Sequence, residues 1–154
     1  MSGGIADWPR SLKQAYNHVK PGGWVELQEY ETWVHSDDGT DKDAIMIQDW
    51  QQKLDQSSSL FGKRMNIARD LSEMMENTGF INVADDAYKE MGRVGKVTLY
   101  EAVEPYTLAL FTRVLGWTYE AQDYVTKVRA ELLDAQYHIY VVFHYIYGQR
   151  PLDG

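Results

Sequence analysis

Two histidines near the C-terminus are the side chains best suited to acid–base chemistry. His138 and His144 are six residues apart, so a regular strand would place both on one face. Imidazole takes up and releases protons near neutral pH, so either residue could donate a hydrogen bond or act as an acid or a base. The alternative is that both are core or interface histidines whose nitrogens are satisfied by hydrogen bonds.

Carboxylates recur between residues 24 and 34. Glu26 and Gln28 alternate with Glu29 and Glu31, so both faces of a strand here would carry polar groups. A buried carboxylate is costly unless it is paired, and we expect any that faces inward to have a raised pKa and a functional role. The alternative is an exposed face on a partly open sheet. With the two histidines, Glu26 and Tyr145 complete the predicted catalytic set.

Asp85 and Asp86 are adjacent acids that suggest a metal site or an acid–base pair. Adjacent strand residues point to opposite faces, so we interpret the two as surface residues. The sequence has no cysteine, no histidine cluster with metal-ligand spacing, no Ser-His-Asp order and no phosphate-binding loop. We therefore predict that no metal ion is bound.

The aromatic content is high, with 11 Tyr, 5 Trp and 4 Phe. One interpretation is a tyrosine-rich core, and the other is a set of rings lining an apolar ligand pocket. The residues predicted to form the wall of such a pocket, together with Tyr145, are Trp24, Tyr30, Trp33, Trp50, Phe111, Trp117 and Tyr140.

Helices and strands must position these side chains, and hydrophobic periodicity predicts where they lie. Lys20-Pro21-Gly22-Gly23 ends the first helix, because proline cannot continue a helix interior and glycine permits a left-handed turn. Residues 137–147 are β-branched or aromatic on both faces, which is typical of a central strand covered on two sides. Helices are predicted over residues 8–19, 43–56, 66–78, 107–115 and 119–133, and strands over 24–34, 80–91 and 137–147.

Composition indicates one globular domain over residues 1–154. The net charge of −8 argues against nucleic acid as a partner, because duplex binding depends on basic residues that contact phosphates. No apolar run reaches the roughly 20 residues of a membrane span. The N-terminus resembles no secretory signal, and cysteine is absent, so we expect a cytoplasmic, intracellular protein.

Two short motifs in this order of elements carry a resemblance to class I S-adenosylmethionine methyltransferases. Val19-Lys20-Pro21-Gly22-Gly23-Trp24 is similar to the turn that leads into the fifth strand of that family, and Asn77-Thr78-Gly79-Phe80 to the signal before the sixth. The resemblance implies that an antiparallel seventh strand inserts between these two. The expected fold class is α/β: a truncated methyltransferase fold with about three strands in a mixed sheet and five or so helices.

A narrower resemblance covers nearly the whole chain and points to fungal LaeA-like methyltransferases of secondary metabolism. Five segments in the same order carry it: Ile5-Ala6-Asp7-Trp8, Gly23-Trp24-Val25-Glu26-Leu27-Gln28-Glu29, Asn66-Ile67-Ala68, Ala109-Leu110-Phe111-Thr112-Arg113-Val114-Leu115-Gly116-Trp117 and Tyr147-Gly148-Gln149-Arg150-Pro151.

The resemblance also marks a departure. The family holds its methyl donor with a glycine-rich loop after the first strand and an acidic residue at the end of the second. The matched segments begin after both, so we expect no bound cofactor, and S-adenosylmethionine only if an N-terminal half supplies its site. An open edge on the fifth strand predicts a homodimer through that edge.

Three functions are compatible with these observations. The favoured hypothesis is a methyltransferase-derived, cofactor-independent cyclase or isomerase that folds an apolar secondary metabolite for a pericyclic step, such as a Diels–Alder reaction. The first alternative is a fragment or subunit of a genuine methyltransferase. The second is a non-catalytic binding or scaffold partner.

Overall fold

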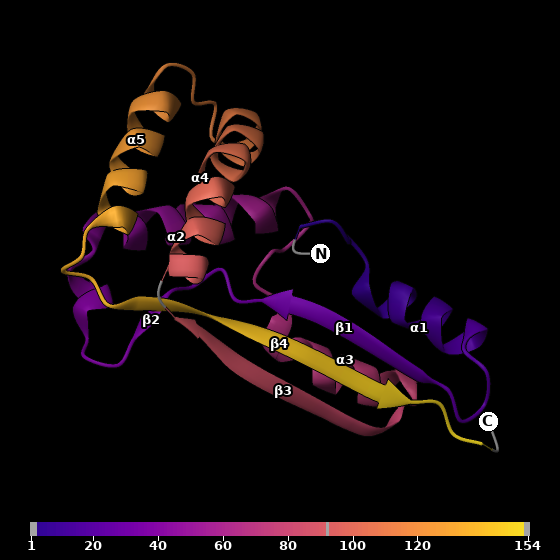
Figure 1. Cartoon of the computed structure of the whole chain (residues 1–154). Helices are drawn as coiled ribbons and strands as arrows, with labels where there is room; N and C mark the ends of the chain where they lie inside the picture. Colours follow the sequence, from indigo (N-terminus) through magenta and orange to yellow (C-terminus); the bar gives the residue numbers. More distant parts are fainter. Residues whose placement is uncertain (1–2, 92, 153–154) are drawn as a thin grey trace.

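The computed structural model describes residues 3–91 and 93–152, except the side chains of residues 91, 93 and 94. Helices and strands follow one another along the chain as drawn in Figure 1. The elements in order are α1 (Trp8–His18), β1 (Trp24–Tyr30), β2 (His35–Ser36), α2 (Ile45–Leu60), α3 (Leu71–Thr78), β3 (Ile81–Met91), α4 (Arg93–Val114), α5 (Glu120–Leu133) and β4 (Ile139–Gln149), with short 3-10 turns at Thr40–Asp43 and Ala68–Asp70.

The last strand is the centre of the sheet. β4 pairs with β1 and β2 on one side and with β3 on the other, and every ladder among the described strands is antiparallel. The predicted insertion of the last strand between the other two is therefore confirmed. β1 and β3 both oppose β4, so they run in the same direction without touching, and the sheet gains a fourth, two-residue strand at β2.

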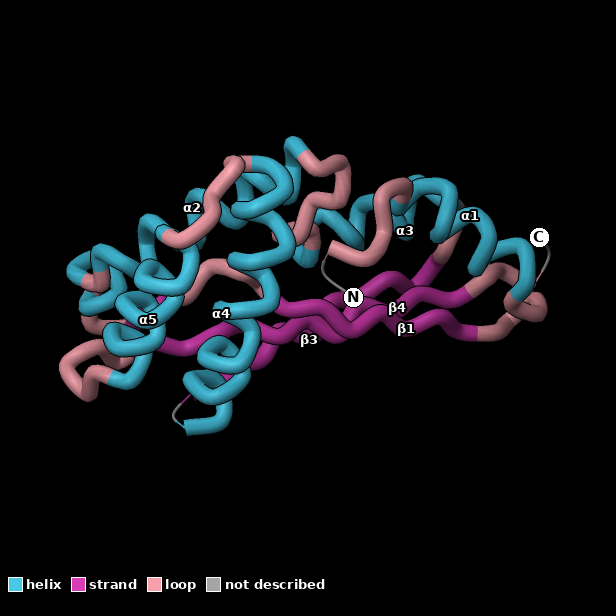
Figure 2. Tube along the Cα trace, turned by 90° about the horizontal axis from the view of Figure 1, so that it is seen from above, coloured by secondary structure: helices cyan, strands magenta, loops and turns pink. Residues whose placement is uncertain are grey.

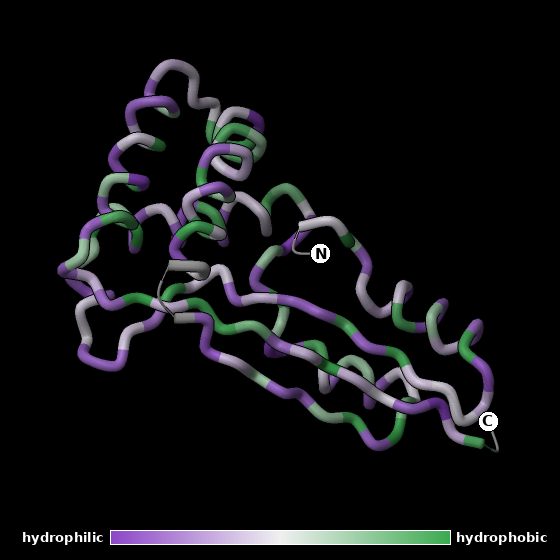
Figure 3. Tube along the Cα trace, in the orientation of Figure 1, coloured by the Kyte–Doolittle hydropathy of each residue, from purple (hydrophilic) through white to green (hydrophobic). Residues whose placement is uncertain are grey.

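The helices divide the two faces of the sheet unequally. In Figure 2, α1, α2 and α3 lie on one side of the strands, and the first turns of α4 reach the other side. In Figure 3, hydrophilic and hydrophobic positions succeed one another along β1, β3 and β4. β4 is consequently covered less completely than predicted: Phe143, Tyr145 and Tyr147 are only half-buried.

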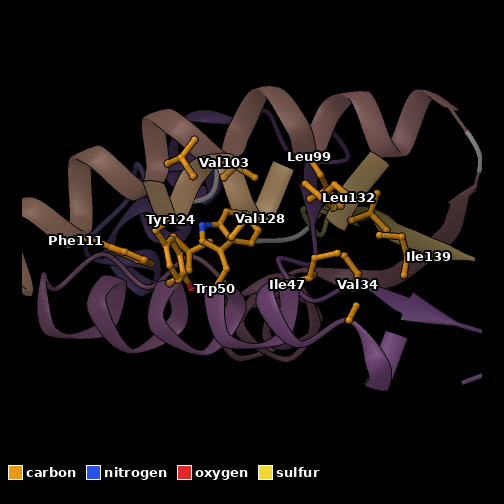
Figure 4. Packing of buried hydrophobic residues seen from close by; sticks show 14 of the residues in the cluster. Val34, Ile47, Trp50, Leu99, Val103, Phe111, Tyr124, Val128, Leu132 and Ile139 are labelled. Carbon is orange, nitrogen blue, oxygen red and sulfur yellow. The ribbon is translucent and has the colours of Figure 1, made fainter. Parts of the chain in front are cut away.

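Apolar side chains form two hydrophobic clusters. Trp8 and Leu12 from α1 pack with Met75 and Ile146 in the smaller cluster, between α1, α3 and the sheet. The larger cluster lies between α2, α4 and α5, and Figure 4 shows several of its members. Each fully buried side chain contributes about 1.5–3 kcal/mol relative to exposure. The labelled members in Figure 4 are Val34, Ile47, Trp50, Leu99, Val103, Phe111, Tyr124, Val128, Leu132 and Ile139.

Local signals set the ends of the first helix. The Asp7 side chain accepts a hydrogen bond from Arg10 N (2.9 Å), and Pro9 occupies the first turn, where its missing N–H is not needed. After α1 the chain turns at Gly22, whose φ of 76° lies in the left-handed region. Gly22 N also donates to Arg150 O (2.9 Å), which ties this turn to the end of β4.

Two predicted elements differ from the observed ones. The predicted strand 24–34 ends at Tyr30, because the chain bends at Thr32 and Trp33 and the N–H of Val34 donates to the side chain of Gln51 instead of to a strand. The predicted helix 107–115 is instead the end of α4, which starts at residue 93 and contains Pro105.

The remaining boundaries shift by a few residues, most of all at the helix predicted over 66–78, whose first residues form a 3-10 turn before Leu71. Among the described helices, none combines the length and apolar character needed to cross a bilayer.

Candidate functional site

A buried carboxylate, Glu31, collects hydrogen bonds from distant parts of the chain. Its backbone N–H donates to Val142 O (2.9 Å), just past the end of β1, and only 3% of its side chain is exposed. His144 on β4 contacts Glu31 Oε1 through Nε2 (3.0 Å), and its Nδ1 lies 2.7 Å from Asp85 Oδ2 on β3. One imidazole therefore bridges two carboxylates across the sheet.

Arg69 and His35 complete this group, which we call the polar cluster (Glu31, His35, Arg69, Asp85 and His144). Arg69 donates from Nε to Glu31 Oε1 (2.7 Å) and from Nη2 to Oε2 (3.0 Å), the two-pronged geometry that makes arginine–carboxylate pairs strong. His35 Nε2 lies 2.7 Å from Glu31 Oε2. Both oxygens of Glu31 are thus used.

These contacts keep Glu31 ionised. Burial alone would raise its pKa, but hydrogen bonds from Arg69, His144 and His35 outweigh burial and hold the pKa below its ordinary value of 4.5. The predicted raised pKa of an inward-facing carboxylate is therefore wrong at Glu31. Ionised carboxylates only accept hydrogen bonds, so His144 Nε2 is the donor in its contact with Glu31.

The polar cluster fixes the segment that joins β1 to β2. The His144 side chain is 6% exposed, so both members of its contact with Glu31 are enclosed by protein. Among the residues that the structure describes, no three histidine or acidic side chains are arranged to hold a metal ion. The hydrogen bonds of the polar cluster hold Glu31 and the bend that follows it against β3 and β4.

The opposite face of the sheet carries aromatic and acidic side chains. Strand register places Glu26 beside Tyr147 and Asp86 beside Tyr145. Side chains alternate along a strand, so these residues point away from the polar cluster. We call this surface the open face, and it consists of Trp24, Glu26, Gln28, Tyr30, Asp86, Tyr88, Phe143, Tyr145 and Tyr147.

A cavity of about 690 Å³ lies over the open face. Its volume lies within the range of small-molecule sites. The rings of Tyr88 and Tyr145 meet edge to face there, with centroids 5.6 Å apart. The negative charge of Asp86 and its hydrogen bond raise the pKa of Tyr147. The cavity is lined by Glu26, Asp86, Tyr88, Lys89, Glu90, Thr98, Phe143, Tyr145 and Tyr147.

Tyr30 marks the end of the open face near α4. Its hydroxyl donates to the hydroxyl of Tyr106 on α4 (2.9 Å), and its ring lies 5.8 Å from that of Phe143. Burial raises the pKa of Tyr30 above its ordinary value, and the neighbouring Tyr106 raises it further. The Tyr30 hydroxyl is thus a neutral hydrogen-bonding group that joins β1 to α4.

The four predicted catalytic residues lie in three separate places. Glu26 and Tyr145 line the cavity, whereas His144 lies on the other face in the polar cluster. His138 precedes β4, is 71% exposed, and places Nδ1 2.6 Å from Asp38 Oδ2. The predicted common face for the two histidines is wrong, because β4 begins at Ile139.

The predicted pocket aromatics are divided between the open face and the core. Trp24 and Tyr30 belong to the open face. Trp50 and Phe111 are buried in the larger hydrophobic cluster, and Trp117 packs against it. The Trp50 indole N–H donates to Thr107 Oγ1 (3.0 Å), so its polar atom is satisfied inside the protein. These three are core or core-edge residues rather than walls of the cavity. Trp50 and Phe111 share helical stripes with apolar neighbours. Trp117 lies in the loop between α4 and α5, and its ring meets those of Phe111 and Tyr124 edge to face.

Trp33 and Tyr140 occupy a third environment, near the bend after β1. Trp33 is half-buried at the bend itself. The hydroxyl of Tyr140 donates to Asp37 Oδ1 (3.1 Å), and the Lys89 ammonium lies 4.7 Å from the centre of its ring. Tyr140 thus joins an ion pair beside β2 instead of the cavity.

Sequence reasoning missed most of the polar cluster. Arg69 and His35 gave no signal, since their partner lies on another element. Glu31 was noted only as one of several alternating acids. Asp85 is an exposed residue, as interpreted, but its side chain also contacts His144 (2.7 Å), which the sequence did not indicate.

Three glycines, Gly23, Gly95 and Gly148, lie where the backbone packs closely against other parts of the protein. A side chain at Gly95 would come within 2.5 Å of Glu90 O, and one at Gly23 within 2.7 Å of Val19 Cγ2. A side chain at Gly148 would meet Met75 at 3.0 Å. Each of these glycines permits close packing of protein on protein, and none opens toward a ligand.

Comparison with known proteins gives a consistent result. The model of a family described as "Methyltransferase domain" matches residues 1–85. Methyltransferase pytC of Aspergillus terreus is 33% identical over 98% of this chain and 51% of its own length. A probable methyltransferase of Emericella nidulans, tdiE, is 30% identical over 94% of this chain and 50% of its own length. The secondary metabolism regulator laeA of Aspergillus fumigatus is 25% identical over 98% and 44%.

Among solved structures, phosphoethanolamine N-methyltransferase 2 of Haemonchus contortus, in complex with S-adenosyl-L-methionine, is 14% identical with a TM-score of 0.44, over 97% of this chain and 31% of that one. The chain spans about half the length of the curated relatives that it matches. The family model covers more than half of the chain, and the predicted resemblance is confirmed. The chain belongs to the methyltransferase domain family.

Proposed function

We propose that this chain is the acceptor-binding half of a methyltransferase of fungal secondary metabolism. The cavity over the open face holds an apolar acceptor, and the methyl donor binds to a segment outside the residues described. The observation that carries this proposal is the aromatic cavity of about 690 Å³. Such a volume suits a small metabolite, and rings that line a cavity bury much of an apolar ligand.

The residues of this half have two tasks in the proposal. Tyr88, Phe143 and Tyr145 contact the acceptor and exclude water from it. The polar cluster keeps the sheet in register behind them, because it ties β3, β4 and the bend after β1 to one carboxylate. Neither task needs the donor, so we assign no chemical step to these residues.

Cofactor-independent cyclisation or isomerisation is the competing proposal for the same cavity. Its support is the presence of Glu26 and Asp86 beside the aromatic rings, where carboxylates could polarise a folded substrate. The two proposals differ in the product: methyl transfer makes the substrate heavier by one methylene group, whereas cyclisation leaves its mass unchanged.

Deletion of the gene in the organism that carries it separates these functions. A compound lacking one methyl group should accumulate, and the wild-type gene should restore the methylated product. Accumulation of an isomer would instead support cyclisation. Unchanged metabolite structures with altered amounts of many metabolites would overturn both and favour a binding or regulatory partner. Complementation with Tyr145→Ala should restore little product, and Tyr119→Ala, at a side chain in solvent, should restore it fully.

Self-association through β1 is a further part of the proposal. Among the described strands β1 pairs only with β4, so its other edge is available to a strand from elsewhere. A second copy or the donor half of the same protein would each satisfy those backbone groups. Light scattering of the chain over a wide concentration range should show a dimer, and a monomer throughout would refute the homodimer.

A further inference from the structure

We propose that the cavity over the open face selects a protonated amine carried on an apolar body. This inference rests on the proposed function, since it names the chemical class of the acceptor. It follows from the charges around the cavity and from the orientation of the rings between them.

Two carboxylates lie on the two strands that flank β4, the strand that carries Phe143, Tyr145 and Tyr147. Glu26 lies on β1 beside Tyr147, and Asp86 lies on β3 beside Tyr145. Neighbouring strands are about 4.8 Å apart and a strand rises about 3.4 Å per residue. Glu26 and Asp86 are separated by two strand spacings and are offset by two residues along β4, so their backbones lie about 12 Å apart. That spacing leaves room for a small cationic group between them, above the tyrosines of β4.

Neither carboxylate is neutralised by a described cation. The salt bridges of the described residues involve neither Glu26 nor Asp86, and the hydrogen bond to Glu26 comes from the neutral Gln28 amide (2.9 Å). Lys89 also lines the cavity, but its ammonium is already bound to Asp37 (2.7 Å). The cavity is therefore left with an excess of negative charge.

The rings strengthen the preference for a cation. Tyr88, Phe143, Tyr145 and Tyr147 line the same space as the two carboxylates. The faces of aromatic rings attract ammonium groups and stay attractive to apolar carbon. An anionic ligand would be repelled by the carboxylates, and a neutral ligand would gain only from burial. A protonated arylalkyl or alkyl amine gains from both.

Calorimetry with matched probes tests the inference. Phenethylamine, phenethyl alcohol and 3-phenylpropionate carry the same ring with a positive, neutral and negative end. We expect the amine to bind the wild-type chain about tenfold more tightly than the alcohol, and the carboxylate to bind most weakly. Added salt should reduce the advantage of the amine, because these carboxylates are exposed.

Paired variants assign the preference to the cavity. Glu26→Gln with Asp86→Asn should abolish the advantage of the amine and leave binding of the alcohol unchanged. Glu73→Gln with Glu76→Gln, on exposed positions of α3 behind the sheet, should leave both unchanged. Circular dichroism should show that all variants keep the wild-type fold.

The outcomes separate this inference from the proposed function. Equal binding of amine and alcohol would overturn the amine preference, whereas the gene deletion could still show a missing methyl group. An amine preference that survives the Glu26 and Asp86 substitutions would also overturn it, because the charge would then lie elsewhere. An amine preference with no missing methyl group would refute the methyltransferase and leave the cavity as an amine-binding site.

Discussion

His144 donates from Nε2 to Glu31 Oε1 over 3.0 Å, although the two residues are 113 positions apart in the sequence. The contact joins the centre of the sheet to the bend after β1. It is enclosed by protein, and Glu31 also binds an arginine and a second histidine. The loss of this one carboxylate should therefore affect several elements at once.

Replacement Glu31→Gln should lower the free energy of unfolding by about 2–3 kcal/mol. The amide keeps the shape of the side chain but leaves His144 and Arg69 without their negative partner. The loss stays below that of a fully buried ion pair because Arg69 is 69% exposed. Urea denaturation measures the change. The matched variant Asp123→Asn breaks an exposed pair with Lys127 and should not change stability measurably. Equal effects of the two would contradict the importance of the polar cluster.

The contribution of Glu31 should depend on pH in a defined direction. Its pKa in the folded protein lies below the ordinary value of 4.5. The stabilisation is therefore complete above about pH 4.5 and is lost as the pH falls through the folded pKa. Unfolding measured from pH 7 to pH 3 should show the wild-type and Glu31→Gln curves converging in acid. A constant gap between them down to pH 3 would contradict the assignment.

Replacement Thr107→Val should lower stability by about 1–2 kcal/mol, because the buried indole N–H of Trp50 would lose its acceptor. Valine has nearly the same shape, so packing is retained. Thermal unfolding measures the loss, and Trp50 fluorescence should change with it. Thr126→Val removes a hydroxyl that binds a carbonyl on the exposed surface of α5 and serves as the control, with no comparable loss.

Replacement Pro105→Ala should stabilise the protein by about 1–2 kcal/mol. Pro105 lies inside α4 and cannot donate a hydrogen bond to the preceding turn, whereas alanine restores that donor and favours helix. The measurement is the urea midpoint. A destabilised Pro105→Ala protein would mean that α4 depends on a proline-specific backbone shape.

Replacement Tyr145→Ala should weaken binding of phenethylamine about tenfold, since the ring supplies both burial and a cation-binding face. Calorimetry measures the change, and Tyr119→Ala should bind as the wild type does. Unchanged affinity of the Tyr145 variant would place the ligand outside the cavity over the open face.

Elements set by local chemistry could be predicted from the sequence. The turn at Gly22 and the end of α3 at Gly79, whose φ is 111°, follow from glycine in the left-handed region. The first part of α4 was not predicted, although Leu99, Val103 and Leu110 form one buried stripe and Pro105 lies inside the helix. Burial of that stripe against α2 and α5 outweighs the missing donor.

The candidate site was only partly predictable. Glu26 and Tyr145 belong to the predicted catalytic set, and both line the cavity over the open face. The partners of Glu31 could not be found from the sequence, since Arg69 and His144 meet it only after three elements have packed together. Trp50 and Phe111 were assigned to the wrong place because an aromatic side chain in a core and one in a pocket have the same sequence pattern.

Because β4 is the central strand and the last one in the sequence, its position determines when the sheet can form during synthesis. Residues 139–149 are synthesised after β1 and β3, yet they supply the ladder partner of both. On the ribosome, the earlier strands therefore emerge with unpaired edges and wait for the last segment before the sheet can close. All pairings of the sheet are distant in sequence, so its formation is the slow event, and the helices α2, α4 and α5 can associate first.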